Sequence, residues 1–193
     1  DESRYTADSW QNLQDVINSV EYNLPAKEQL RIDGFADAIN EAIKALKEKG
    51  ADYTAVNAII EEWNKMDKTL YTDASVLNVA NAVNSVDWNL PISKQATVDG
   101  YVTTIRDAMN KLQYKPADYS AVNAAMEKVE EAKRIQAAFA TAHNGYSYYT
   151  KDSYDALLAT TNYDRNLDIR YQSTVYGFAT AINNALLNLK PNK

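Results

Sequence analysis

The feature that most constrains the fold of this chain is an internal repeat. Residues 18–46 return at residues 84–112, an offset of 66 residues, and 12 of the 29 aligned positions are identical. A second block, residues 51–58, returns at residues 117–124 with the same offset, and a weaker third copy follows in residues 166–189. A period of this length predicts an array of similar supersecondary units.

Within each repeat, apolar residues lie three and four positions apart, as in an amphipathic helix and unlike the alternation of a strand. The clearest stretch contains Ile32, Phe35, Ile39 and Ile43 in the first copy, Val98, Tyr101, Ile105 and Met109 in the second, and Val175, Phe178, Ile182 and Leu186 in the third. Three such patterns per repeat predict an all-α fold of tandem antiparallel three-helix bundles. We expect about eight helices in an elongated array, and no sheet.

The repeats divide the chain into three parts. Residues 1–50 hold the two helices of a partial repeat, residues 51–115 a full repeat, and residues 116–193 a third repeat. Tyr119 and Tyr149 are 30 residues apart, whereas their counterparts Tyr53 and Tyr71 are 18 apart. The difference of 12 residues equals about three helical turns, so we expect the first helix of the third repeat to be longer.

The string Tyr5-Thr6-Ala7-Asp8-Ser9-Trp10 returns at residues 71–76 and 149–154 as Tyr-Thr-x-x-Ser followed by a bulky apolar residue. We expect Thr6 to be an N-cap whose hydroxyl accepts the backbone N–H three residues on. Tyr5 and Trp10 then occupy the two positions of a hydrophobic staple. The string therefore indicates a helix start rather than a catalytic signature.

The same periodicity gives an expected core. Its members are Trp10, Phe35, Ile39, Trp63, Val83, Ile105, Leu112 and Phe178. Gly34, Gly100 and Gly177 recur in the middle of helical patterns, where Gly costs roughly 1 kcal/mol relative to Ala. Their recurrence predicts that a neighbouring helix approaches the backbone closely at these positions.

Composition excludes several classes of function. The net charge is −6 and no Lys/Arg stripe is present, so we expect no nucleic-acid partner. Cysteine is absent, which excludes disulfides, thiol catalysis and Cys-based zinc sites. No apolar run approaches about 18 residues, so we expect no membrane insertion. Without a nucleophile–base pair, a phosphate loop or a metal-ligand cluster, we expect neither an enzyme nor a cofactor.

Two motifs are candidates for a chemical role, and each also has a purely structural explanation. His143, the sole histidine, is conceivable as a general base, but a cationic side chain at a helix C-terminus commonly complements the helix dipole. Residues 162–168 alternate oxygen ligands as a calcium loop does. They lack the turn glycine, and Val175 stands where a bidentate Glu is needed. We favour a helix linker that ends in Asp168 as an N-cap.

The aligned repeats resemble the FIVAR ("found in various architectures") helical repeats of Gram-positive surface and secreted proteins. The resembling residues are the Tyr-Thr-x-x-Ser-Trp start at 5–10, residues 117–122, Gln95-Ala-Thr-Val-Asp99, Ile105 and Leu112. The resemblance implies an all-α bundle in an extracellular, multi-domain protein that is secreted or attached to the cell wall. Carbohydrate-active or adhesive modules often accompany such repeats. In the third copy Tyr176 replaces Asp and Asp168 replaces Pro, which departs from the pattern.

The aromatic residues give the candidate ligand-binding site. Fourteen Tyr and three Trp stand against three Phe, a bias common on surfaces that recognise sugars or proteins. The candidate residues are Tyr146, Tyr148 and Tyr149 beside the lengthened helix, His143, and Trp88 and Tyr22 in the turns of the first two repeats. Two interpretations stay open: these aromatics fill the ends of bundles, or they form a ligand platform.

The sequence therefore supports two hypotheses of function. The first is a non-catalytic extracellular spacer or adhesion module of a multi-domain bacterial surface protein. The second is a carbohydrate-binding module that recognises polysaccharides or glycoprotein glycans through its Tyr cluster. The partners expected are glycans, host or cell-surface proteins, and neighbouring domains of the parent chain.

Overall fold

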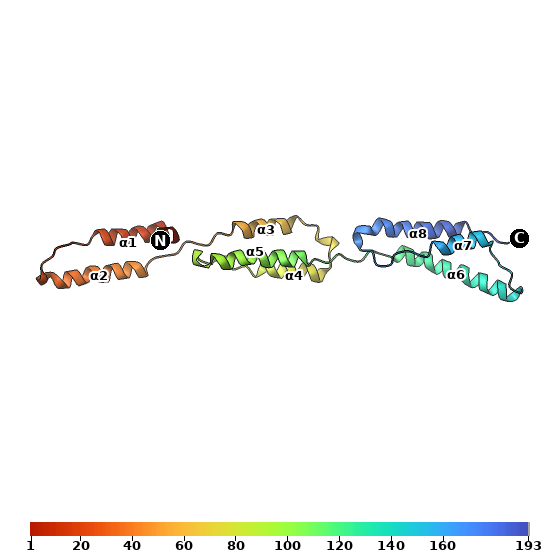
Figure 1. The fold of residues 1–193 in the computed structure, drawn as a ribbon, viewed down its shortest axis with the longest axis horizontal. Coiled ribbons are helices and arrows are strands. Elements are labelled where there is room, and N and C mark those ends of the chain that lie inside the picture. The colour runs from red at the N-terminus through yellow and green to blue at the C-terminus, as the bar shows by residue number, and fades with distance from the viewer. Residues whose placement is uncertain (193) are drawn as a thin grey trace. The chain divides into compact units, whose positions relative to one another are not determined.

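A computed structural model describes residues 1–192 of the chain, and these residues form eight α-helices without a β-strand (Figure 1). The helices are α1 (Ala7–Asn18), α2 (Gln29–Lys44), α3 (Thr54–Lys65), α4 (Asp73–Asn84), α5 (Gln95–Asn110), α6 (Ser120–Ala142), α7 (Lys151–Ala159) and α8 (Gln172–Leu187). Short 3-10 turns precede α1, α2, α4, α5 and α8. The all-α prediction is confirmed for the described part of the chain.

The chain forms two compact units. The first contains Asp1–Met66 and Ala74–Lys111, and the second contains Asp67–Asp73 and Leu112–Lys193. In the first unit α1 packs against α2, and α3 packs against α5. In the second unit α6 and α7 both pack against α8. In the two repeats that have three helices, the last helix, α5 or α8, therefore packs against the first helix, α3 or α6.

The core is concentrated on these helix pairs. In the first unit, Val56, Ile59 and Trp63 of α3 are buried, as are Val98, Ile105 and Met109 of α5. In the second, the fully buried side chains are Val122, Val129, Leu157, Val175 and Ile182. Of the predicted core residues, Trp63 and Ile105 are buried. The other six, Trp10, Phe35, Ile39, Val83, Leu112 and Phe178, are only half-buried.

The Tyr-Thr-x-x-Ser string does more than start a helix. Thr6 is the N-cap residue of α1, but its hydroxyl makes no capping bond to the backbone, so that prediction is wrong. Instead it donates to Ser9 Oγ at 2.9 Å, and Ser9 Oγ also accepts the backbone N–H of Lys47 at 3.1 Å. Thr150, Ser153 and the N–H of Lys190 repeat this arrangement. The string therefore ties the start of one helix to the chain that leaves another.

The expected staple is seen as a ring pair in the two copies that have an aromatic residue at its second position. The Tyr5 and Trp10 rings are stacked 6.1 Å apart, and a stacked pair at 6.0 Å is formed by Tyr149 and Tyr154. Tyr71 stacks on Tyr114, at 4.7 Å. The string thus stands at a helix start, and its tyrosine forms the expected ring pair in these two copies. The prediction did not include the bond between its serine and a distant backbone N–H.

The segments between repeats are held by paired backbone hydrogen bonds. In the first linker, Thr6 N–H donates to Lys47 O and Lys49 N–H to Arg4 O, while Ala51 N–H donates to Leu90 O and Ile92 N–H to Lys49 O. In the second, the corresponding donor–acceptor pairs are Thr72–Gln113, Lys115–Leu70, Ala117–Leu167 and Ile169–Lys115. All eight bonds are 2.8–3.0 Å long. We call these two arrangements linker clamp 1, which lies in the first unit, and linker clamp 2, which lies in the second.

Side chains reinforce each clamp in the same way. The Gln95 carboxamide accepts the N–H of Asp52 at 2.7 Å and donates to the Asp52 carbonyl at 2.9 Å. Gln172 forms the same two bonds, with the same lengths, to Asp118. The clamped backbone is thereby joined to the first turn of α5 or α8.

The predicted close approach at three glycines is wrong. A Cβ atom built on Gly34, Gly100 or Gly177 would meet nothing within 4 Å outside its own helix. These positions are open, so their recurrence has no packing explanation in the described part of the chain.

Ile105→Ala should lower the free energy of unfolding by about 2–5 kcal/mol, because a fully buried side chain leaves a cavity. Ile105 is 0% exposed, whereas Ile39, at the same position of the preceding repeat, is only half-buried. Ile39→Ala is therefore the matched control and should cost less. Urea unfolding followed by circular dichroism measures both, and equal losses would contradict this assignment of the core.

Candidate functional site

The candidate site in the second unit begins where α6 ends. This helix has 23 residues against 12 for α3, which confirms the predicted lengthening. His143 is its C-cap residue, and its backbone N–H donates to Phe139 O at 3.0 Å. Gly145 has a φ of +87°, a left-handed conformation that favours glycine, and its N–H donates to Ala140 O at 2.8 Å. The chain turns there and delivers three tyrosines to the start of α7.

Five rings follow one another from the end of α6 to α7, and we call them the aromatic ladder: His143, Phe139, Tyr148, Tyr149 and Tyr154. His143 stacks on Phe139 with ring centroids 3.9 Å apart. Tyr148 meets Phe139 edge-on at 5.3 Å and Tyr149 edge-on at 4.8 Å. Offset and edge-to-face contacts of this kind add about 0.5–1.5 kcal/mol per pair beyond the buried area.

Polar bonds hold the ladder in place. The Tyr149 N–H donates to Gln136 Oε1 on α6 at 3.1 Å, and the Asn192 N–H donates to Tyr148 O at 2.7 Å. His143 Nδ1 lies 3.0 Å from Phe139 O. The imidazole is thus engaged with its own helix end, as the dipole interpretation of the sequence predicts, rather than with a reacting pair.

Exposure separates the ligand-platform residues from the packing residues. The Tyr146 side chain is 73% exposed, and His143 is exposed as well. Tyr148 and Tyr149 are half-buried. Burial raises the pKa of the Tyr149 hydroxyl above the ordinary tyrosine value, and the neighbouring Tyr148 contributes to the same shift. A ligand at this site would meet Tyr146, His143 and one edge of Tyr148.

Trp88 and Tyr22 do not belong to the aromatic ladder, because both lie in the other compact unit. Trp88 is 46% exposed and packs against Tyr53, with centroids 5.0 Å apart. The Tyr53 hydroxyl donates to Asp87 O at 2.5 Å and accepts the Leu90 N–H at 3.1 Å. Trp88 therefore covers a tyrosine that bridges the turn, whereas Tyr22 is 76% exposed.

The calcium interpretation of residues 162–168 finds no support in the geometry. The Asp164 carboxylate accepts the Asn166 N–H at 2.8 Å, and the backbone carbonyl of Asp164 accepts the Tyr119 hydroxyl at 2.9 Å. Asp168 caps the 3-10 turn that follows and binds the Arg170 guanidinium with both oxygens. The hydrogen bond and charge of Arg170 hold the pKa of Asp168 below its usual range. Among residues 1–192, no group of three or more acidic or histidine side chains is placed to hold a metal ion.

Sequence reasoning missed a second aromatic cluster, at linker clamp 2. The Arg170 guanidinium carbon lies 3.8 Å from the centroid of the Tyr114 ring. Tyr114 in turn stacks on Tyr71, which stands two residues before the start of α4. The hydrogen bond between the two hydroxyls raises the pKa of Tyr71. In linker clamp 1, Glu48 stands at the position of Tyr114 and Ser93 at that of Arg170, and the Glu48 carboxylate binds both Arg4 and Ser93. The repeat aligns these positions, but the difference in residue type hides their shared role.

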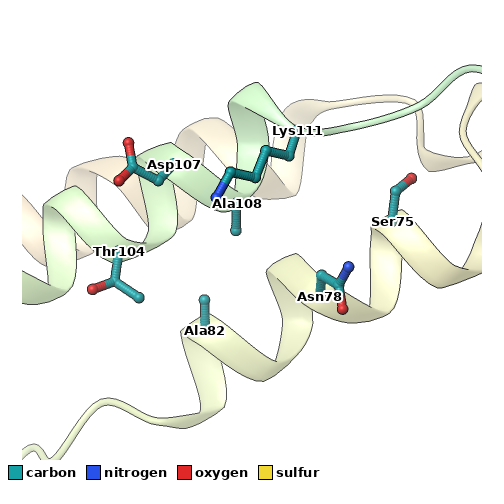
Figure 2. Close-up of a pocket in the computed structure, with 7 residues that line it drawn as sticks. All are labelled: Ser75, Asn78, Ala82, Thr104, Asp107, Ala108 and Lys111. Carbon is teal, nitrogen blue, oxygen red and sulfur yellow. The ribbon is translucent and has the colours of Figure 1, made fainter.

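Sequence reasoning also missed a groove of about 430 Å³ between α4 and α5. Ser75, Asn78 and Ala82 line it from α4, and Thr104, Asp107, Ala108 and Lys111 line it from α5. Figure 2 shows Ala82 and Ala108 pointing toward each other across it, with the Asp107 carboxylate pointing away. Small side chains on the facing surfaces leave this space. Grooves of about 490 and 470 Å³ lie at the corresponding serines of the other two repeats, Ser9 and Ser153, so the feature recurs.

Comparison with known proteins gives no relative. No family model matches the chain, no curated protein matches it, and no solved structure matches it. Within residues 1–192, no helix combines the length and apolarity needed to cross a membrane.

The raised pKa of Tyr149 predicts a loss of stability in alkali. Above about pH 10, the ordinary pKa of tyrosine, the unfolded chain ionises first. Ionisation of the unfolded state then removes stability until the pH passes the folded pKa. Urea unfolding between pH 8 and 11 should show this decline, and Tyr149→Phe should make it shallower. Tyr146→Phe, at an exposed tyrosine, is the matched control, and an equal effect of both variants would contradict the prediction.

Proposed function

We propose that the chain is a non-catalytic spacer and adhesion module of an extracellular, multi-domain bacterial protein, built from FIVAR-like three-helix-bundle repeats. The observation that carries the proposal is the pair of linker clamps. Each linker donates and accepts backbone hydrogen bonds on both sides, to an earlier segment and to a later one. A connection held in this way has few conformations to explore, and such a connection suits a module whose role is to keep its neighbours apart.

The distribution of shared residues supports the same proposal. Gln95 and Gln172 bind the linker backbone, Tyr53 and Tyr119 bridge the turns, and Ile105 and Ile182 fill the core. These recurring residues thus serve the fold, whereas Gly34, Gly100 and Gly177 recur without a packing contact. The FIVAR resemblance adds the extracellular setting and the secreted or wall-attached localisation.

Loss of one clamp bond should loosen the chain without unfolding it. The Lys115 N–H donates to Leu70 O in linker clamp 2, so Lys115→Pro removes that donor, whereas Lys115→Ala keeps it. Because the chain has no cysteine, Asp73→Cys and Leu187→Cys, at two exposed positions of the second unit, accept spin labels cleanly. Pulsed electron resonance should give a narrow distance distribution that broadens in Lys115→Pro only.

Circular dichroism must show that the helices of the Lys115→Pro variant persist, so that the broadening reports the linker. A broad distribution in the unsubstituted chain would overturn the spacer proposal, because a flexible connection cannot hold neighbouring domains at a set distance.

A second candidate function, glycan binding, is favoured by one specific observation. The aromatic ladder begins on the part of α6 that exceeds the length of α3, and a plain spacer needs no such local elaboration. Tyr146 and His143 are exposed beside Tyr148, and exposed aromatic faces commonly stack on sugar rings. The ladder would then be the adhesive surface of the module.

Titration with starch, mucin and cell-wall glycans tests this second function. Saturable binding should be abolished in the double variant Tyr146→Ala, Tyr148→Ala, and should persist in Tyr176→Ala, at an exposed tyrosine on α8. Absence of binding to every glycan would reject the glycan platform and leave the spacer as the sole proposed role. Binding that survives the double variant would place the glycan site elsewhere.

A further inference from the structure

Two tyrosines face each other across linker clamp 2. Tyr71, just before α4, and Tyr114, shortly after α5, form an isolated antiparallel bridge within the second unit. The backbone hydrogen bonds on either side of the bridge, at 2.8 and 2.9 Å, join the neighbours of the two tyrosines and not the tyrosines themselves. Tyr71 and Tyr114 are therefore a non-hydrogen-bonded pair, in which the side chains of antiparallel segments lie closest together.

The two rings lie side by side and point in the same direction. Their centroids are 4.7 Å apart, their planes are inclined by 27°, and the Tyr71 hydroxyl donates to the Tyr114 hydroxyl at 3.4 Å. Because both the centroids and the hydroxyl oxygens are close, the Cε atoms beside each hydroxyl lie near their counterparts on the other ring. Oxidised phenols couple to each other through these ortho carbons.

The surroundings hold this arrangement in place. The Arg170 guanidinium carbon lies 3.8 Å from the centroid of the Tyr114 ring, and the Asp168 carboxylate binds Arg170 with both oxygens. Tyr71 is only 9% exposed, whereas Tyr114 is half-buried and so is partly open to solvent, where an oxidant can take electrons. Two reactive groups held in contact react far faster than the same groups free in solution.

The same bridge recurs in the other repeats without a second tyrosine. Tyr5 pairs with Glu48 in the first repeat, and Tyr149 pairs with Pro191 in the third. Glu48 and Pro191 stand at the position of Tyr114 in the aligned repeats. Neither residue has a ring that can couple to a phenol, so the tyrosine pair is particular to linker clamp 2.

Other ring contacts between tyrosines within residues 1–192 are less suited to coupling. The Tyr119 and Tyr163 rings are stacked at 6.4 Å, and the Tyr149 and Tyr154 rings at 6.0 Å. Tyr148 and Tyr149 are closer, at 4.8 Å, but their planes are nearly perpendicular, at 85°. The pair in linker clamp 2 combines the shortest of these centroid distances with a stacked arrangement.

We propose that Tyr71 and Tyr114 are an oxidative modification site, at which a one-electron oxidant of the peroxidase type joins the two side chains as a dityrosine. Oxidation takes one electron from each ring and one proton from each hydroxyl. A carbon–carbon bond then forms between one Cε of each ring, and each bonded Cε loses its proton while the phenol oxygens are protonated again. Two electrons and two protons leave in total, and one hydrogen peroxide molecule takes them up and becomes two molecules of water.

The bond would make linker clamp 2 permanent. It would close a loop that contains α4 and α5. The chain has no cysteine, so a disulfide cannot supply such a cross-link. A covalent bond across a long loop stabilises a fold mainly by restricting the unfolded chain, as a disulfide does. The cross-linked chain should therefore unfold at a higher urea concentration than the untreated chain.

The experiment oxidises the full chain with a haem peroxidase and hydrogen peroxide, at a low protein concentration that disfavours coupling between chains. The monomer should lose the mass of two hydrogen atoms and gain the fluorescence of dityrosine. Proteolysis and tandem mass spectrometry should find the peptides that contain Tyr71 and Tyr114 joined to each other. Urea unfolding of the isolated product should show the higher midpoint.

Variants of the pair locate the cross-link. Tyr71→Phe and Tyr114→Phe keep the packed rings and remove one hydroxyl each, so each variant should abolish dityrosine in the monomer. Tyr163→Phe is the matched control, because Tyr163 stacks on Tyr119 and its buried hydroxyl has no hydrogen-bond partner among the described residues. The control should give the same yield as the unsubstituted chain. Circular dichroism must show the same helix content in all three variants.

Three results would overturn the proposal. The first is an oxidised monomer that contains no dityrosine although the exposed Tyr146 has been oxidised. The second is dityrosine that persists in the monomer of both Tyr71→Phe and Tyr114→Phe, which would place the cross-link at another pair. The third is dityrosine found only in dimers, which would mean that the rings couple between chains and not across linker clamp 2.

Discussion

The structure depends on the burial of one helix face in each repeat. Val98 and Ile105 of α5, and Val175 and Ile182 of α8, are at most 1% exposed, and each pair is covered by the first helix of its repeat, α3 or α6. Full burial of such side chains stabilises by about 1.5–3 kcal/mol each. The remaining helix of each repeat contributes less: Ser75 and Val79 are the buried residues of α4, and Leu157 is the buried residue of α7. Each repeat therefore resembles a tight helix pair with a third helix beside it, and the groove of Figure 2 lies where that third helix approaches the pair.

The linker clamps extend this packing beyond the helices. Backbone groups that leave a helix need hydrogen-bond partners, and here the partners come from segments before and after the linker. Different side chains can stabilise the same backbone arrangement: Arg4, Glu48 and Ser93 use charge in linker clamp 1, whereas Tyr71, Tyr114 and Arg170 use ring stacking and a cation–π contact in linker clamp 2.

The all-α fold and the extent of most helices could be predicted from the sequence, because apolar spacing in α2, α5 and α8 records which face is buried. The core was predicted less well. Trp63 and Ile105 are buried as expected, but Phe35 and Ile39 are half-buried, since periodicity identifies a face and cannot say whether a neighbour covers it. The role of Ser9 was out of reach for a related reason. Its partner, the N–H of Lys47, lies 38 residues away, and a local capping rule considers only neighbours in sequence.

For the candidate site, the sequence identified the aromatic residues but could not say which of them are exposed to a ligand. Tyr146, Tyr148 and Tyr149 are adjacent in sequence, yet one is 73% exposed and the other two are half-buried in ring contacts. The grouping of Trp88 and Tyr22 with them rested on residue type, and both lie in a different compact unit. Trp88 in particular has a structural task, covering the Tyr53 ring.

Comparison of the repeats also narrows the search for a ligand site, because shared residues that have a structural contact can be set aside. Residues identical between the first two copies, such as Ser19 and Ser85, bond the last turn of their own helix, and Gln95 and Ile105 serve the linker and the core. What differs between copies is therefore more informative about function, and the clearest difference is the set of exposed aromatic residues beyond the length of α3.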